Sequence, residues 1–251
     1  MEYAHLSSTV NIKTIEETGT EGVFEIEGLY AGYGLTMGNA LRRALLSSLP
    51  GAAVTYIKVK NVAHEFSTLP GMKEDLINLI LNFKRLRFEM TVNEPQVLLI
   101  EAKGERVVTG ADIKTKSEVK VVNPEQVLAT LTEKSAELVV EITVERGLGY
   151  SAVESRKAEK LAIGMIGVDA FFSPVTAANY TVENMRVGDR TDYNRLRLTV
   201  TTDGTITPSD ALHKAGNILK DHFDKVSAVE VKEKEATAEE PAKKTRKKKA
   251  E

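Results

Sequence analysis

Three glycines, Gly32, Gly34 and Gly38, are the part of this sequence that comes nearest to a chemical motif. Residues 23–27 alternate between polar and apolar types, which predicts a strand before the glycines, and a helix is expected after them. In that setting Gly-x-Gly-x-x-Gly binds a dinucleotide. Here the third glycine is one position late, and the next expected strand, 56–60, carries lysines where a ribose-binding carboxylate is needed. The spacing therefore argues against a nucleotide cofactor.

Other residue patterns that support catalysis or metal binding are missing from the sequence. There is no cysteine, and the four histidines, His5, His64, His213 and His222, lack the spacing of metal ligands. We find no nucleophile elbow, no phosphate-binding loop with its lysine, and no aspartate cluster for catalytic metal ions. We therefore predict no cofactor, no metal ion and no catalytic residue, and expect a protein that acts by assembly.

The helix expected at 37–49 is apolar around most of its circumference. One apolar stripe recurs every three or four residues, and Leu46 and Leu49 fall outside it, beside Arg42 and Arg43. Two interpretations fit this pattern. The helix is buried on most sides within its own domain, with the arginine stems lying over the core edge, or it offers a second apolar face to another chain.

Periodicity and capping signals predict the remaining elements. Alternation indicates strands at 54–60, 97–102, 118–122, 138–144 and 196–200. Helices are expected at 72–84, after the cap and proline at 123–124, and from 207 to about 226. Gly216 lies in the apolar stripe of the last helix, where a glycine costs about 1 kcal/mol, so we expect a backbone of this chain or of another to approach it. Strands with few interleaved helices predict the α+β fold class.

Composition places the chain among globular proteins with a charged tail. Its 251 residues, 42% of them hydrophobic, suit one large domain or two smaller ones. We recognise no signal peptide and no apolar segment of membrane length, and expect a cytoplasmic protein. The net charge is −2, but residues 241–251 hold six Lys or Arg and one Glu, which leaves −7 on the rest. We interpret 230–251 as a disordered charged tail with weak, speculative nucleic-acid contacts at Lys243, Lys244, Arg246, Lys247, Lys248 and Lys249.

Residues 32–51 resemble the signature of the alpha subunit of bacterial DNA-directed RNA polymerase. Shorter segments support the resemblance in the family's order up to about residue 230, at 64–68, 73–75, 80–84, 123–127, 145–150, 168–170, 173–175 and 190–192. Two departures stand out. Residues 28–31 read Gly-Leu-Tyr-Ala where the family usually has Pro-Leu-Glu-Arg, and family members usually continue into a small helical DNA-binding domain that this sequence lacks.

The resemblance implies a fold and a dimer. A discontinuous dimerisation subdomain, with a sheet and two long helices, is expected from residues 1–51 and 179–229, and an inserted, mainly β subdomain from 52–178. Two copies are expected to pair as a homodimer. The residues expected at the dimer interface are Leu41, Leu45, Leu212, Gly216, Leu219 and Phe223.

The resemblance also implies partners. The dimer is expected to initiate assembly of RNA polymerase, a nucleotidyltransferase, by binding the beta subunit through Arg43 and Leu46. The residues expected to meet beta-prime are Lys84, Ser173, Pro174 and Val175. Omega and sigma complete the enzyme, which acts at the nucleoid, and DNA is met indirectly or weakly through the tail. The alternatives are a stand-alone nucleic-acid-binding module acting through the tail and a nucleotide-dependent enzyme.

Overall fold

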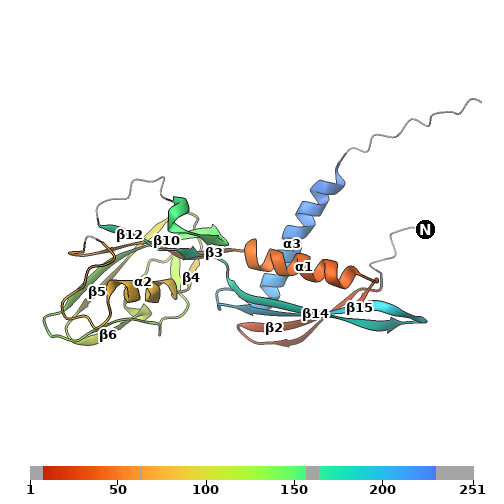
Figure 1. Ribbon diagram of the computed structural model, residues 1–251, viewed down its shortest axis with the longest axis horizontal. Helices are drawn as coiled ribbons and strands as arrows, with labels where there is room; N and C mark the ends of the chain where they lie inside the picture. Colours follow the sequence, from red (N-terminus) through yellow and green to blue (C-terminus); the bar gives the residue numbers. More distant parts are fainter. Residues whose placement is uncertain (1–7, 63, 157–163, 230–251) are drawn as a thin grey trace, which may run out of the picture.

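The computed structural model describes residues 8–62, 64–156 and 164–229. Figure 1 shows that they form two sheet-containing parts joined end to end. We call residues 8–49 and 175–229 the four-stranded part and residues 50–174 the inserted part. The chain passes from the first to the second where β3 (Pro50–Val59) begins, and it returns at the start of β14 (Val175–Val187).

The four-stranded part is built from both ends of the described chain. Its antiparallel sheet has the order β1-β2-β15-β14, with β1 at Asn11–Glu17, β2 at Glu21–Leu29 and β15 at Arg190–Thr202. The central strands β2 and β15 pair residues that are far apart in sequence, such as Glu25 with Arg197. Helix α1 (Tyr33–Ser47) packs on β14 and β15, and α3 (Pro208–Ser227) packs against α1 (Figure 1).

A separate apolar core fills each part. In the four-stranded part, the inward row of β15, formed by Leu196, Leu198 and Val200, is fully buried together with Leu45 of α1. This burial follows from the period of two along the strand, which places alternate residues on one face. The helices therefore cover only one face of the four-stranded sheet.

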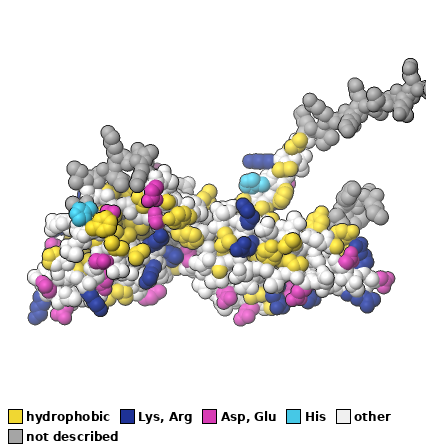
Figure 2. Space-filling model, viewed as in Figure 1, with side chains coloured by type: hydrophobic (Ala, Val, Ile, Leu, Met, Phe, Trp, Pro, Cys, Tyr) yellow, Lys and Arg dark blue, Asp and Glu magenta, His cyan; other side chains and the backbone are white. Residues whose placement is uncertain are grey.

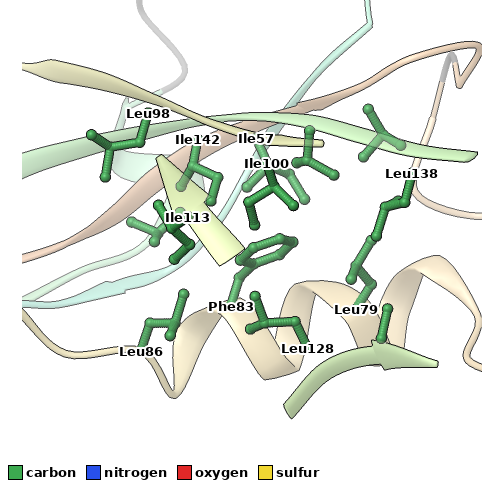
Figure 3. Packing of buried hydrophobic residues seen from close by; sticks show 14 of the residues in the cluster. Ile57, Leu79, Phe83, Leu86, Leu98, Ile100, Ile113, Leu128, Leu138 and Ile142 are labelled. Atoms are coloured by element: carbon green, nitrogen blue, oxygen red, sulfur yellow. The ribbon is translucent and has the colours of Figure 1, made fainter. Parts of the chain in front are cut away.

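The inserted part contains a seven-stranded sheet of order β7-β5-β10-β3-β4-β8, with β12 beside β3. Helix α2 (Leu76–Lys84) lies against this sheet, and Phe83 points from it into the centre of the core between Ile100 and Leu128 (Figure 3). Two short ribbons, β6 with β9 and β11 with β13, complete it. The remaining bounds are β4 Phe88–Met90, β5 Gln96–Lys103, β6 Arg106–Thr109, β7 Ile113–Lys114, β8 Val119–Val121, β9 Val127–Leu131, β10 Glu137–Leu148, β11 Tyr150–Ser151, β12 Met165–Gly167 and β13 Ala170–Phe171, with single 3-10 turns at Gly110–Asp112 and Val153–Arg156.

The inserted part is tightly packed where β3 begins, next to its junction with the four-stranded part. A Cβ added to Gly51 would lie 1.9 Å from the carbonyl oxygen of Phe172, so only glycine fits at this position. Nearby, the Arg87 Nε of the inserted part lies 3.5 Å from the Asp203 Oδ2 of the four-stranded part. An ion pair therefore joins the two parts beside a tightly packed segment of the inserted part.

The predicted α+β class is confirmed, but the helix expected after residues 123–124 is wrong. Residues 127–131 form strand β9, which pairs with β6. The Asn123 side chain does not cap a helix, because it accepts a hydrogen bond from the Arg87 N–H and donates one to the Arg85 carbonyl. Backbone bonds from Gly110 and Ala111 also hold this segment extended. Contacts distant in sequence override the local helix signal here.

The other predicted helices exist, with shifted starts. α1 begins at Tyr33 rather than at residue 37, and α2 begins at Leu76, capped by Asp75, rather than at residue 72. α3 begins as predicted, because the Thr207 side chain accepts a hydrogen bond from the Asp210 N–H. Among the helices of the described residues, none combines the length and the apolarity needed to cross a membrane.

Candidate functional site

The glycines in and after the turn before α1 allow the helix to pack closely on the sheet. A Cβ on Gly34 would lie 2.7 Å from Val182, and one on Gly38 would lie 2.6 Å from Tyr180, so the glycines let α1 lie directly on the sheet. The Asn194 Oδ1 accepts hydrogen bonds from the backbone N–H groups of Gly32 (2.9 Å) and Gly34 (3.3 Å). A phosphate would need those same N–H groups. Because they already donate to Asn194, the turn does not form a dinucleotide site.

The second apolar face expected on α1 is smaller than the sequence suggested. Leu49 follows the helix and is fully buried in the core of the four-stranded part, while Leu46 is half-buried at the edge of that core. Leu45, expected at the dimer interface, also has no exposed surface. A side chain without exposed surface does not contact a second copy, so Leu45 belongs to the protomer core.

The two adjacent arginines of α1 differ in their partners. The Arg42 Nε donates to the Ala178 carbonyl at 2.9 Å, which ties the helix to β14. The Arg43 side chain is exposed and forms no hydrogen bond or ion pair with any part of the chain that the structure describes. Arg43 therefore offers a free guanidinium one turn away from the half-buried Leu46.

An apolar groove of about 430 Å³ runs between the N-terminal half of α3, α1 and the edge of the sheet. Leu41 and Leu212, both expected at a dimer interface, line it, as do Gly216 and the strand residues Ile12 and Phe24. Apart from its chain neighbours and the backbone of its own helix, no heavy atom of the described residues lies within 4 Å of a Cβ built on Gly216. The close approach expected at Gly216 is therefore not made by the described residues of the same chain.

The C-terminal half of α3 extends beyond the body of the four-stranded part (Figure 1). Leu219 is half-buried, but Phe223 is 63% exposed and Val226 is 66% exposed. Figure 2 shows hydrophobic side chains along this projecting helix. Large apolar side chains at spacings of three and four residues with nothing covering them indicate an unpartnered helix face.

Lys84 lies at the end of α2 in a cluster of aromatic and charged groups. Its Nζ is 3.7 Å from the Asp169 Oδ2 and 5.9 Å from the centre of the Tyr150 ring. The Val153 N–H, which donates to the Asp169 Oδ1 at 3.0 Å, is the main reason why the pKa of Asp169 lies below its ordinary value, and Lys84 adds to this shift. Tyr150 is 58% exposed, so the cluster is open to a partner.

The other residues expected to meet a partner with Lys84 are inside the protein. Ser173, Pro174 and Val175 are all buried, and the Ser173 hydroxyl donates to the Val175 carbonyl and accepts from the Val175 N–H. We therefore correct the prediction that these three side chains contact a partner directly. They fix the chain where it re-enters the four-stranded part.

The remaining candidates are dispersed or lie outside the described residues. His213 lines the groove, His222 contacts the Ile218 carbonyl on the exposed helix, and His64 contacts Ser67. His5 and the tail at 230–251, with its proposed nucleic-acid contacts, lie outside the described residues. Within the described ranges, no group of three or more His, Asp or Glu is placed to hold a metal ion.

Sequence reasoning missed several residues of these surfaces. Ile12 of the edge strand β1 lines the groove, Tyr150 is exposed beside Lys84, and Leu148, two residues before Tyr150, is also exposed. Alternation of apolar and polar residues around Ile12 was the available signal. No comparable signal marks Leu148 and Tyr150, because their exposure depends on where β10 and β11 end.

Comparison with known proteins places these surfaces in context. Residues 56–173 match the family model described as the RNA polymerase Rpb3/RpoA insert domain. The chain is 52% identical over 202 residues to the DNA-directed RNA polymerase subunit alpha of Moorella thermoacetica, covering 80% of this chain and 64% of that protein. The subunit alpha of Symbiobacterium thermophilum is 48% identical over 210 residues, with coverage of 84% and 66%. That of Desulfitobacterium hafniense is 45% identical over 237 residues, with coverage of 90% and 75%. The chain thus spans just under two thirds of the first two relatives.

Proposed function

The chain belongs to the family of DNA-directed RNA polymerase alpha subunits, and we propose on this basis that it is a scaffold on which the larger subunits of that polymerase assemble. In this proposal the chain contributes to a nucleotidyltransferase complex without supplying catalytic groups. The four-stranded part corresponds to the dimerisation subdomain, expected at 1–51 and 179–229, and the inserted part to the subdomain expected at 52–178. The complex acts in the cytoplasm, at the nucleoid.

The observation that carries the proposed homodimer is the presence of a groove and an exposed apolar ridge on the same helix. The groove lies beside Gly216, and the ridge of Phe223 and Val226 begins two turns later. A two-fold interface uses the same patch on both subunits, so that patch must carry both complementary shapes. Burying a Phe or Val side chain contributes about 1.5–3 kcal/mol, and the two-fold axis doubles every such contact.

Replacing Phe223 with Asp tests the dimer. We expect Phe223→Asp to convert a dimer into a folded monomer, because the exposed side chain stabilises nothing within its own protomer. Phe66→Asp is the matched control, since Phe66 is 74% exposed but lies on the inserted part. Sedimentation velocity measures the mass and circular dichroism checks the fold. A monomeric wild type, or a dimeric Phe223→Asp variant, would refute the proposed interface.

We propose that Arg43 and Leu46 meet the beta subunit and that Lys84 meets beta-prime. The free guanidinium of Arg43 and the open cluster around Lys84 support these roles. We expect Arg43→Ala to leave the dimer intact and to weaken capture of the beta subunit, by about 2–5 kcal/mol if the contact is buried. Arg42→Ala is the comparison, because Arg42 is engaged with its own sheet. Equal capture by the two variants would count against the assignment.

A further inference from the structure

A cavity of about 250 Å³ lies at the junction of the two parts. Phe88 and Met90 of β4 and Ile206, which precedes α3, give it apolar walls. Arg146 of β10 and Lys214 of α3 line the same cavity. Each part of the molecule thus contributes one cation to a hollow that neither part forms alone.

Arg146 occupies an unusual place in its strand. The inward row of β10 is apolar and buried at Leu138, Val140, Ile142 and Val144, and Arg146 is the next residue in that row. It pairs with Ala52 of β3, and Ala52 in turn pairs with Phe88. Paired residues of an antiparallel sheet project to the same face, so the small Ala52 side chain leaves room between the guanidinium and the aromatic ring.

The cations of the cavity are poorly neutralised. The Arg146 Nη1 donates to the Asn93 Oδ1 at 3.0 Å, and no carboxylate of the described residues lies within ion-pair distance of the guanidinium. Lys214 Nζ is 3.8 Å from an exposed carboxylate, that of Asp210. Glu89 is the one acidic residue that lines the cavity in the described chain, and its carboxylate lies 4.0 Å from the Lys120 Nζ. The exposed guanidinium of Arg146 therefore lies next to apolar walls without a carboxylate partner among the described residues.

The cavity continues the surface proposed above for the beta subunit. Leu49 and Pro50 form part of its wall, and Leu46 lies in the last turn of α1, three residues before Leu49. Arg43 lies one turn earlier on the same helix. A chain bound along this end of α1 therefore lies next to the Leu49 and Pro50 wall of the cavity.

We propose that the cavity receives an acidic side chain, with an apolar residue beside it, from the large polymerase subunit that binds the end of α1. This inference rests on the proposed assembly function. The planar guanidinium of Arg146 binds a carboxylate through two parallel hydrogen bonds, and Lys214 adds a second charge from the other part. One carboxylate held by both cations would link the two parts as well as the two subunits.

The test measures capture of the purified large subunits by the 251-residue chain at low and at high salt. We expect Arg146→Gln to weaken capture about tenfold or more and to reduce its salt dependence. We expect Lys214→Gln to weaken capture less than Arg146→Gln does. The double variant should weaken capture by less than the product of the two single fold-changes, because both cations bind one carboxylate. Arg186→Gln is the control, since the Arg186 side chain is 70% exposed on β14 and lies far from the cavity.

The outcomes separate this inference from the function on which it rests. If the wild type captures no large subunit, the proposed function fails. If Arg146→Gln captures as well as Arg186→Gln, only the acidic contact is overturned. Should Arg146→Gln fail to fold, Arg146→Lys and Lys214→Gln must both weaken capture, and normal capture by either variant overturns the inference. Inorganic phosphate that raises the melting temperature of the wild type, with capture unaffected by Arg146→Gln, would identify a site for a free anion and overturn it as well.

Discussion

The ion pair between Arg87 and Asp203 permits a quantitative test of how the two parts are joined. The Arg87 side chain is 27% exposed and that of Asp203 is 8% exposed, with 3.5 Å between Nε and Oδ2. Exposed pairs contribute about 0.2–1 kcal/mol, whereas breaking a buried pair costs about 3–5 kcal/mol. Because the pair is partly screened by solvent, we expect a coupling free energy of about 1–2 kcal/mol.

A double-mutant cycle isolates this coupling from the other bonds of both residues. The Arg87 Nη1 also donates to the carbonyls of Lys84 and Leu86, and the Asp203 Oδ1 accepts from the N–H and hydroxyl of Thr205. Arg87→Gln and Asp203→Asn, alone and combined, remove the charges while the cycle cancels these local losses.

Urea unfolding of the four proteins at one protein concentration gives the free energies. The coupling is expected to fall at about 1 M salt, where exposed charges are screened. A coupling below about 0.5 kcal/mol, which is the level of additive error, would refute the view that this pair helps to hold the junction.

Three further predictions concern stability. Gly51→Ala places a methyl group against a backbone oxygen and is expected to cost about 3 kcal/mol, whereas Gly19→Ala, with open space around it, changes the urea midpoint little. Phe83→Ala removes a fully buried ring and should cost about 3–5 kcal/mol, and Phe66→Ala, at an exposed site, less than about 0.5 kcal/mol. Because the pKa of Asp169 is lowered in the folded state, its ionised carboxylate stabilises the protein above the ordinary Asp pKa, and this stability is lost as the pH falls through the folded-state pKa. Asp169→Asn should therefore make the free energy of unfolding depend less on pH below about pH 4.

Local patterns were sufficient for much of this fold. The inward row of β10 and that of β15 were predicted from alternation, and the start of α3 from the Thr207 cap. These features depend on neighbours within one turn or one strand, which the sequence displays directly. The misplaced glycine spacing and the lysines of β3 also argued against a dinucleotide site, and the Asn194 contacts explain what the glycines do.

Features that depend on distant segments were not predictable in the same way. The segment after Asn123 carries good helix signals but pairs as strand β9, because β6 and the loop at Arg87 bind it. Leu45 and Val175 were expected at interfaces, yet both are fully buried by residues from the opposite end of the chain. The cavity at Arg146 could likewise not be predicted from the sequence, because its walls come from both parts.

The pairing of β2 with β15 constrains how the protein is made on the ribosome. β2 ends at Leu29 and β15 begins at Arg190, so at about 5–20 residues per second the first strand waits roughly 10–30 s for its neighbour. The inserted part is complete by residue 174, and its own core allows it to fold during this interval. The nascent N-terminal segment must therefore stay protected from aggregation until β15 has left the ribosome, and the proposed dimer can form only after α3 has been released.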